Sequence, residues 1–369
     1  MQERKKRRIV IASVLKPIDD TRMYEKMGKS LATFYEVHII GHASICQPVD
    51  VPIHFHPSPL FKRLSIKRWL VRWQMLKAIA KLKPDLLIIT THELLLTALL
   101  CKLTGCRIIY DVQENYYRNI RHTAAFPKIV RPLLALYVRC KEYLAAPFID
   151  HFFLAEKGYT QELQFPRKRF TILENKLKRP FLQQHRRKRV NDLHFLFTGT
   201  LAETTGIFIA IDLIEKLYCE DPSVRLTIIG YCAQLATLEK LRSQIANKPY
   251  ILLKGGDILV PHAEILKEIE SASIGIVAYP FNPSTTHSVP TKLYEYLGYQ
   301  LPILLIDHIS WKAICEPYHA AVVFNAHSPD IRNILTEIRT IEFYTAIPHD
   351  VYWESEEVKL LDVVHKLIP

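Results

Sequence analysis

Short apolar runs, separated by stretches of helical periodicity, recur along almost the whole chain. Such runs, bounded by turn residues, are typical of buried strands. Strands that alternate with helices form a parallel sheet covered by helices on both faces. The first seven runs are 9–15, 35–41, 51–54, 85–90, 107–112, 151–155 and 170–173, and the last six are 193–197, 225–230, 250–253, 274–279, 303–306 and 320–324. The chain is therefore predicted to be an α/β protein built on parallel sheets.

The alternation is interrupted at residues 176–192, where a basic polar stretch contains His185–Arg189. The 369 residues are enough for two domains with separate cores. We predict one domain over 1–175, a linker over 176–192, a second domain over 193–340 and a C-terminal helical segment over 341–369. Doubly wound domains bind ligands at the carboxyl ends of their strands, so candidate sites are sought in the loops that follow strands.

The chain carries a formal net charge of +12, which favours an anionic partner such as a phosphorylated substrate, a membrane surface or a nucleic acid. It contains 11 glycines and neither a G-x-G-x-x-G nor a Walker A motif, so the common glycine-rich phosphate cradles are excluded. A nucleic-acid function also lacks a recognition motif, and no nucleic-acid partner is predicted.

The cysteine pattern indicates a reducing compartment. The seven cysteines are scattered, odd in number and never in a C-x-x-C pair, so neither disulfides nor structural zinc is expected.

Arg4–Arg8 and the apolar run after it resemble a signal peptide, but the run ends early, at Lys16-Pro17, without a small-residue cleavage site. No run approaches the roughly 20 residues that span a bilayer. We expect a cytoplasmic protein, with peripheral attachment to the inner membrane face as an option.

The stretch Pro290–Pro302 reads as a helix between two strands, and Pro290 suits the first helical position. Lys292 is unusual there, because the first turn of a helix carries a partial positive charge of about +0.5 and disfavours a cation. Free N–H groups together with a lysine form an anion site, most naturally for phosphate. Glu295, one turn further, can accept hydrogen bonds from sugar hydroxyls. The alternative is a solvated Lys/Glu pair on an ordinary surface helix.

Read as P-T-K-L-Y-E-Y-L-x-x-x-L-P-I-L, this stretch resembles the nucleotide-binding segment of retaining GT-B glycosyltransferases of family 4. The resemblance implies a GT-B fold, in which two doubly wound, Rossmann-like domains face each other across a cleft. It implies that Glu295 holds the donor ribose, and that loop amides and the helix start hold the diphosphate, at Ser288, Val289, Thr291 and Lys292. The family's commonest form has a second glutamate where this chain has His287, which we keep as a catalytic candidate.

The first turn of the second domain departs from the family. Relatives usually read G-R-L-x-x-x-K-G there, with the Arg and the Lys on the leaving diphosphate, whereas this chain has Thr200 and Thr205 at those positions. Gly199 and Thr200 are still predicted to contact the donor, and Lys254, after a later strand, is expected to flank the base. With two cations missing, either Lys292 and backbone amides hold the diphosphate, or donor binding is weak or absent.

Three more catalytic candidates follow strands of the first domain. Family members with D-x-R after the first strand place that loop at the cleft, which implies that Arg22 binds acceptor or donor; Asp20 also suits the N-cap of the helix that begins there. His92 follows the fourth strand. Glu114 follows the fifth strand, where relatives often read D-x-H-E and this chain has Gln113 in place of the histidine.

The stretch Phe61–Lys83 is strongly basic and places Trp69 and Trp73 one helical turn apart. One interpretation is an interfacial helix whose basic face meets an anionic membrane surface. The favoured interpretation is a helix that covers the sheet, with Trp69, Trp73 and Leu76 packed inward. The two interpretations are compatible if one face of the helix packs against the sheet and its basic face contacts lipid.

These observations predict a retaining glycosyltransferase that moves a sugar from a UDP- or GDP-linked donor to a hydroxyl of a glycan or lipid-linked acceptor, in polysaccharide biosynthesis. Positioned N–H donors and cations would stabilise the leaving diphosphate. Because no acidic pair or Asp-x-Asp motif stands out as a metal site, neither a metal nor another cofactor is expected. The alternative is a catalytically weak or inert homologue that acts as a binding subunit of a glycosyltransferase complex. Thr200 and Thr205 favour that alternative, and Lys292 with Glu295 opposes it.

Overall fold

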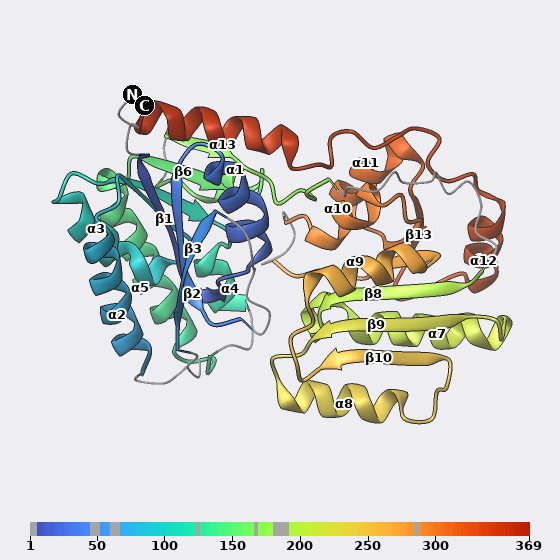
Figure 1. Cartoon of the computed structure of the whole chain (residues 1–369). Helices are drawn as coiled ribbons and strands as arrows, with labels where there is room; N and C mark the ends of the chain where they lie inside the picture. The colour runs from blue at the N-terminus through green and yellow to red at the C-terminus, as the bar shows by residue number, and fades with distance from the viewer. Residues whose placement is uncertain are drawn as a thin grey trace. The chain divides into compact units, whose positions relative to one another are not determined.

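The described residues form thirteen strands in two parallel sheets, and each strand overlaps an apolar run predicted from the sequence (Figure 1). This computed structural model describes residues 6–44, 52–59, 67–122, 126–165, 169–179, 192–283 and 288–369, without the side chains of residues 67–69. Two compact units result, the first comprising Met1–Lys178, Thr286–Ser288 and Trp353–Pro369, and the second Arg179–Thr285 and Val289–Tyr352. The prediction of two doubly wound α/β sheets is confirmed.

Seven parallel strands form the sheet of the first unit, in the order β3-β2-β1-β4-β5-β6-β7. Their bounds are β1 (Arg8–Pro17), β2 (Glu36–His42), β3 (Ile53–Ser58), β4 (Leu86–Ile89), β5 (Arg107–Val112), β6 (His151–Leu154) and β7 (Phe170–Ile172). The strand order reverses between β1 and β4, because β2 and β3 lie on one side of β1 and the later strands on the other. Doubly wound sheets bind ligands at the carboxyl ends of the strands at such a switch point.

Helices cover both faces of this sheet, because alternate residues of each strand contribute to two separate cores. Ile9 and Ile11 of β1 belong to a core shared with η1 (Thr21–Gly28, wound as a π-helix), α1 (Lys29–Ala32) and α13 (Glu354–Leu367). Val10 and Ala12 belong to the core beneath α2 (Lys67–Leu82), α3 (Leu95–Lys102) and α5 (Arg131–Ala145). The shorter helices are η2 (His92–Leu94), α4 (Tyr116–His122), η3 (Ala146–Phe148) and α6 (Tyr159–Glu162).

Six parallel strands form the sheet of the second unit, in the order β10-β9-β8-β11-β12-β13. The strands are β8 (His194–Thr200), β9 (Arg225–Tyr231), β10 (Ile251–Gly256), β11 (Ile274–Val277), β12 (Ile303–Ile306) and β13 (Ala321–Phe324). The helices are η4 (Glu203–Thr205), α7 (Ile207–Glu220), α8 (Leu235–Ile245), α9 (His262–Ser271), α10 (Thr291–Gly298), α11 (Ile309–Cys315), η5 (Glu316–Tyr318) and α12 (Ile331–Thr340). Here the strand order reverses between β8 and β11, which places the switch point of this sheet at their carboxyl ends.

The C-terminal segment is helical over a shorter range than predicted. Helix α13 begins at Glu354, whereas the prediction began at residue 341. Two tyrosines hold the intervening chain on the second unit, because the hydroxyl of Tyr344 donates to the carbonyl of Leu301 (2.6 Å) and that of Tyr352 to the carbonyl of Gly298 (2.9 Å). These long-range bonds fix an irregular path that local periodicity does not reveal.

The inward packing predicted for Trp73 is wrong. Helix α2 buries Val71, Met75 and Ile79, while the Trp73 side chain is 60% exposed. Leu76 is half-buried, and Phe61–Ile66 and the side chain of Trp69 lie outside the described residues. Among the described helices, none is long and apolar enough to cross a membrane.

Candidate functional site

The switch point of the second sheet contains a tight turn that requires glycine. Gly199 lies at the end of β8 with a φ of +93°, and Gly206 opens α7 with a φ of +80°. A Cβ atom on Gly206 would lie 1.8 Å from the carbonyl oxygen of Ala278, which follows β11. Only glycine therefore lets α7 start this close to the end of β11.

Helix α10 is fixed against β8 by a buried tyrosine. The hydroxyl of Tyr296 lies 3.0 Å from the Thr198 hydroxyl, and the absence of a side chain on Gly275 leaves room for the tyrosine ring. Pro290 is the N-cap, one position earlier than the sequence suggested, with a φ of −59° and a ψ of 131°. The first-turn amides and the positive end of the helix dipole thus lie at the switch point, where an anion is favoured.

Lys292, the second residue of α10, is a buried lysine. It is 5% exposed, and its ammonium has no hydrogen-bond partner among the described residues. Nζ lies 3.7 Å from the ring centroid of Phe197 and 5.3 Å from that of Tyr279, and Cε lies 3.9 Å from where a Cβ of Gly199 would be. Burial lowers the pKa of Lys292 to about 7, an effect that the nearby Glu295 carboxylate partly offsets. The side chain is therefore directed at the end of β8 without a counter-charge in hydrogen-bond contact.

Glu295 is held by a histidine that the sequence analysis did not select. Its Oε1 lies 3.0 Å from Nε2 of His262, the first residue of α9, and Glu295 is 8% exposed. The one available signal was position, because His262 opens the helix that follows β10. The pair fixes the orientation of the carboxylate that was predicted to bind ribose.

Thr200 and Thr205, which stand where the resemblance to family 4 would place an Arg and a Lys, differ in environment. Thr205 is buried, and its hydroxyl donates to the carbonyl of Thr200 (2.7 Å) and accepts from the backbone N–H of Ala202 (3.2 Å). Thr205 therefore closes the turn. The side chain of Thr200 is exposed at the end of β8. Neither residue contributes positive charge, and among the described residues Lys292 is the cation that approaches Gly199.

The other predicted donor contacts are spread around this site. Lys254 ends in an ion pair with Glu268 of α9, with Nζ 2.5 Å from Oε1. Three predicted contacts precede or open α10 and are all half-buried, namely Ser288, Val289 and Thr291. His287 lies outside the described residues, so its predicted catalytic role stays a prediction.

In the first unit, Arg22 forms a buried ion pair at the carboxyl ends of β1 and β5. Its Nε and Nη2 donate to the two carboxylate oxygens of Asp111 at 2.9 and 2.6 Å, and Gln113 donates to the same carboxylate at 2.9 Å. Nη1 of Arg22 is buried without a hydrogen-bond partner among the described residues. Asp20 caps η1 as predicted, accepting from the backbone N–H groups of Arg22 and Met23. The sequence analysis selected Arg22 but missed Asp111.

His92 and Glu114 have separate neighbours in the same unit. Nδ1 of His92 lies 3.0 Å from Nζ of Lys141, and its ring packs edge-on against Tyr116 with the centroids 4.6 Å apart. A neutral imidazole nitrogen can accept a hydrogen bond from that ammonium. Glu114 is exposed and accepts a hydrogen bond from Asn119 at 2.8 Å. Their catalytic roles stay predictions.

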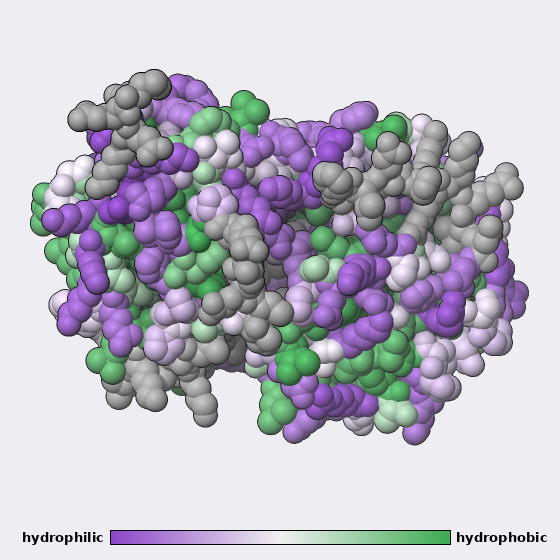
Figure 2. Space-filling view, viewed as in Figure 1, coloured by the Kyte–Doolittle hydropathy of each residue, from purple (hydrophilic) through white to green (hydrophobic). Residues whose placement is uncertain are grey.

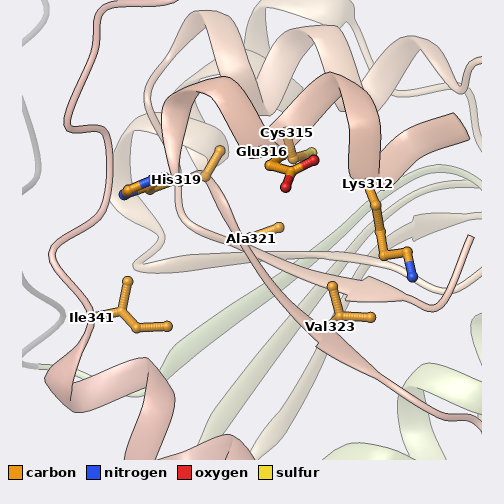
Figure 3. A pocket seen from close by; sticks show the side chains of 8 residues that line it. Lys312, Cys315, Glu316, His319, Ala321, Val323 and Ile341 are labelled. Carbon is orange, nitrogen blue, oxygen red and sulfur yellow. The ribbon is translucent and has the colours of Figure 1, made fainter. Parts of the chain in front are cut away.

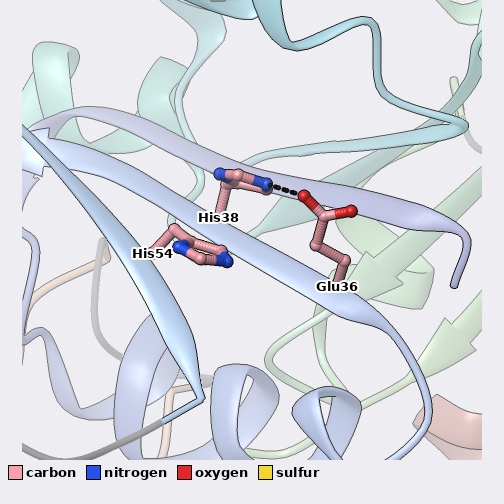
Figure 4. Close-up of side chains that lie close together, drawn as sticks. All are labelled: Glu36, His38 and His54. Carbon is pink, nitrogen blue, oxygen red and sulfur yellow. Dashed lines mark hydrogen bonds and ion pairs between the residues drawn. The ribbon is translucent and has the colours of Figure 1, made fainter.

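One group of described side chains has metal-ligand chemistry and lies on β2 and β3, in the first unit. Ligand atoms of Glu36, His38 and His54 lie within 4.8 Å of one another (Figure 4). However, both oxygens of Glu36 already accept hydrogen bonds from Arg8, at 2.9 and 3.1 Å, and Nδ1 of His38 lies 2.9 Å from a ring nitrogen of His56. A dication would sit beside the Arg8 guanidinium, so we assign no metal role here, and the expectation of metal-free chemistry stays a prediction.

Two cavities flank β13 in the second unit. The larger, of about 560 Å³, lies beside α11 and contains none of the predicted site residues (Figure 3). Burial raises the pKa of its Cys315 to about 12, which makes that thiol a poor nucleophile. The smaller, of about 290 Å³, lies at the carboxyl ends of β11, β12 and β13 and is lined by Tyr279, Asp307 and Asn325, among others. Because Tyr279 also adjoins Lys292, the smaller cavity is the one next to the α10 site.

No protein-family model matches the sequence, and no curated protein does. Solved structures do match. Sucrose-phosphate synthase from Thermosynechococcus elongatus has a TM-score of 0.71 at 11% identity, over 98% of this chain and 99% of that one. HepE from Anabaena, in complex with UDP and glucose, has a TM-score of 0.67 at 11% identity, over 97% and 99%. The alpha,alpha-trehalose 6-phosphate synthase from Burkholderia multivorans has a TM-score of 0.60 at 10% identity, over 98% and 95%. The two doubly wound sheets and these likenesses together show that the chain has the GT-B fold.

Proposed function

We propose that this protein is a glycosyltransferase that transfers a sugar from a UDP- or GDP-linked donor to a hydroxyl group. The observation that carries the proposal is Lys292, a buried lysine without a hydrogen-bond partner among the described residues, at the start of α10. Burying a cation without an anion beside it is unfavourable. An anionic ligand that enters this site relieves that cost and also meets the helix dipole.

The donor diphosphate is assigned to the region between Lys292 and the turn at Gly199, with the amides of Ser288, Val289 and Thr291 as further donors. Glu295, oriented by His262, accepts hydrogen bonds from the ribose hydroxyls. Negative charge builds up on the diphosphate as the glycosidic bond breaks, and a protonated Lys292 stabilises that charge. Retention of configuration, and chemistry without a metal, are also proposed; retention rests on the resemblance of α10 to family 4.

The acceptor side is assigned to the first unit, with Arg22, His92 and Glu114 as its candidate residues. We propose a glycan or lipid-linked acceptor in polysaccharide biosynthesis, and a cytoplasmic protein attached to an anionic membrane surface through Phe61–Lys83. The net charge of +12 supports an anionic surface. In HepE, a solved structure with the same fold, UDP and glucose are bound, which supports a nucleotide-sugar donor.

A second candidate function is a nucleotide-binding subunit without turnover. It is favoured by Thr205, whose hydroxyl closes the turn where relatives carry a lysine. Both candidates predict nucleotide binding, and they differ in whether the sugar is released from the donor.

Thermal unfolding with a panel of UDP- and GDP-sugars tests the proposal. A ligand at 100 times its dissociation constant adds about 2.7 kcal/mol to the free energy of unfolding. We expect one nucleotide class to stabilise the wild type and the Lys216→Met control, whose lysine is exposed on α7, and to stabilise Lys292→Met much less. Release of free sugar or a glycosylated acceptor then separates the enzyme from the binding subunit. If no donor stabilises the wild type, both functions are contradicted.

A further inference from the structure

Helix α5 places small residues against the core and large apolar residues in solvent. Ala135, Val138 and Ala145 are buried. The exposed large residues, each 54–75% accessible, are Leu133, Leu136, Tyr137 and Leu144. Their spacing of three, four and seven places them along one side of the helix. A row of large apolar side chains along one side of a helix is ordinarily covered by another element, and these four are exposed in the isolated chain.

The neighbouring helices on the same face of the sheet repeat this pattern. On α3, Leu96 is 57% and Leu100 41% exposed, and on α2, Leu70 is 61% and Trp73 60% exposed. Helix α3 contacts both α2 and α5. A cavity of about 420 Å³ between α2 and α3 has apolar walls that include Leu76. Figure 2 shows hydrophobic residues gathered over α2 and α3 at the left edge of the first unit.

The helices of the second unit serve as an internal comparison. Their described large apolar residues with high exposure are Leu235 on α8 and Ile309 on α11, one on each helix. Isolated residues of this kind are normal on a protein surface, whereas a set on three adjacent helices marks an interaction site.

Cations outnumber acids on the helices that carry the exposed leucines, although three of these cations, Lys102, Arg118 and Arg139, form ion pairs with Asp150, Glu162 and Glu142. Lysine and arginine occur five times in α2, once in α3, twice in α4 and three times in α5. The only acid in these four helices is Glu142, which is 3% exposed and faces the core. The exposed Lys77 and Lys81 therefore have no acid on their own helix, α2, and Lys128 is exposed in the segment that precedes α5.

We infer that the outer surface of α2, α3 and α5, named here the docking surface, binds an anionic lipid bilayer. The leucines would enter the boundary between headgroups and acyl chains, and the lysines would remain among the headgroups. An apolar area flanked by cations suits this boundary, because the acyl chains there lie next to anionic headgroups. This extends the inserting residues from the Phe61–Lys83 stretch, which contains α2, to α3 and α5. It rests on the proposed function in one respect, because it makes a lipid-linked molecule the acceptor class.

Sedimentation of the full chain with vesicles tests the inference without donor or acceptor. The vesicles are phosphatidylcholine alone, or phosphatidylcholine mixed with phosphatidylglycerol, each at low and high salt. The apolar variant is Leu133→Ser, Leu136→Ser and Leu144→Ser, and its matched control is Leu235→Ser with Ile309→Ser. The charge variant is Lys77→Glu, Lys81→Glu and Lys128→Glu.

We expect the wild type and the matched control to bind the anionic vesicles, more weakly at high salt. The apolar variant should bind at least about tenfold more weakly at either salt, and the charge variant should lose the salt-sensitive part of the affinity. In a Trp69→Phe background, emission from Trp73 should shift to the blue on binding, since the remaining Trp311 and Trp353 are buried. That shift should be absent in Trp73→Phe.

Three results would overturn the inference: no binding to anionic vesicles, equal binding by the apolar variant and its control, or a wild-type dimer that the apolar variant dissociates. The last result would show that a second copy covers the docking surface. Nucleotide binding by the same variants keeps this test separate from the proposed function. An apolar variant that no longer binds vesicles but still binds nucleotide supports both the inference and the proposed function. A wild type that binds vesicles but no nucleotide contradicts the proposed function alone.

Discussion

The ammonium of Lys292 lies 3.7 Å from the ring centroid of Phe197, and no described residue accepts a hydrogen bond from it. The ring face attracts a cation but accepts no proton and brings no net charge. Lys292 is thus in place before any ligand arrives, at the cost of desolvating its charge. A diphosphate at the start of α10 would supply the missing counter-charge, which makes the lysine the centre of the proposed donor site.

Replacing Lys292 should stabilise the ligand-free protein in a pH-dependent way. The pKa of Lys292 falls from its ordinary value of 10.5 to about 7 on folding, so between these pH values the unfolded chain binds more protons and stability rises with pH. The cost of burying the charge is fully present below pH 7 and vanishes above 10.5. Lys292→Met should therefore be more stable than the wild type at pH 6, by on the order of a few kcal/mol, and nearly equal above pH 10.

Urea unfolding of both proteins across this pH range measures the effect. The exposed Lys216→Met variant is the control and should differ little from the wild type at every pH. A Lys292→Met variant that is less stable than the wild type at pH 6 would contradict the burial argument.

The Glu295–His262 pair should control nucleotide affinity. Glu295→Gln keeps the shape but weakens charge-assisted hydrogen bonds worth about 1.5–3 kcal/mol, so the dissociation constant for UDP or GDP should rise roughly tenfold to hundredfold. His262→Ala keeps the Glu295 carboxylate but removes the side chain that orients it, so the dissociation constant should rise by about tenfold at most. Titration calorimetry gives both constants. Unchanged affinity in a folded Glu295→Gln protein would remove the ribose role.

A cation should be tolerated at position 200 but should destabilise the protein at position 205, the two places where the resemblance to family 4 predicts an Arg and a Lys. Thr200 is exposed, so Thr200→Arg should change stability by no more than about 0.5 kcal/mol and tighten nucleotide binding. Thr205→Lys loses the hydrogen bond to the carbonyl of Thr200 and puts a long side chain in a buried place, so a loss of about 1–3 kcal/mol is expected. Urea unfolding with nucleotide titration compares the two. Equal stability of both variants would show that the Thr205 hydroxyl does not hold the turn.

The Arg22–Asp111 pair should contribute to folding and to function separately. Removing one partner leaves a buried charge uncompensated, so Arg22→Met should lose about 3–5 kcal/mol of unfolding free energy. The double variant Arg22→Met with Asp111→Leu should recover most of that loss. If Arg22 also binds acceptor, the double variant will be folded and will bind nucleotide but will not transfer sugar. Wild-type transfer by the double variant would leave Arg22 with a structural role alone.

The sheet architecture was predictable because every described strand overlaps an apolar run, although β3, Ile53–Ser58, extends well beyond the run predicted at 51–54. Helix α2 shows where such patterns fail. Its sequence is apolar at Val71, Met75 and Ile79 as well as at Trp69 and Trp73, so helical periodicity alone does not select the face that packs. The medium-sized side chains fill the space above the sheet, and Trp73 faces solvent.

The candidate site was predictable only in part. Lys292 and Glu295 lie on one helix, where spacing and dipole give a local signal. Their surroundings do not, because His262 is 33 residues from Glu295 in sequence, and Asp111 is 89 residues from Arg22. Such pairs form through tertiary contacts that a single sequence does not encode as a motif.

Proton uptake on nucleotide binding tests the central claim most directly. At pH 8 a lysine with a pKa of about 7 is mostly neutral, and a diphosphate beside it should raise that pKa and draw in about one proton per nucleotide. Calorimetric titration of UDP or GDP in buffers of different ionisation enthalpy measures the uptake. The account predicts a binding enthalpy that varies with the buffer in the wild type and in Lys216→Met, and not in Lys292→Met. Tight binding with the same enthalpy in every buffer would show that Lys292 does not contact the diphosphate.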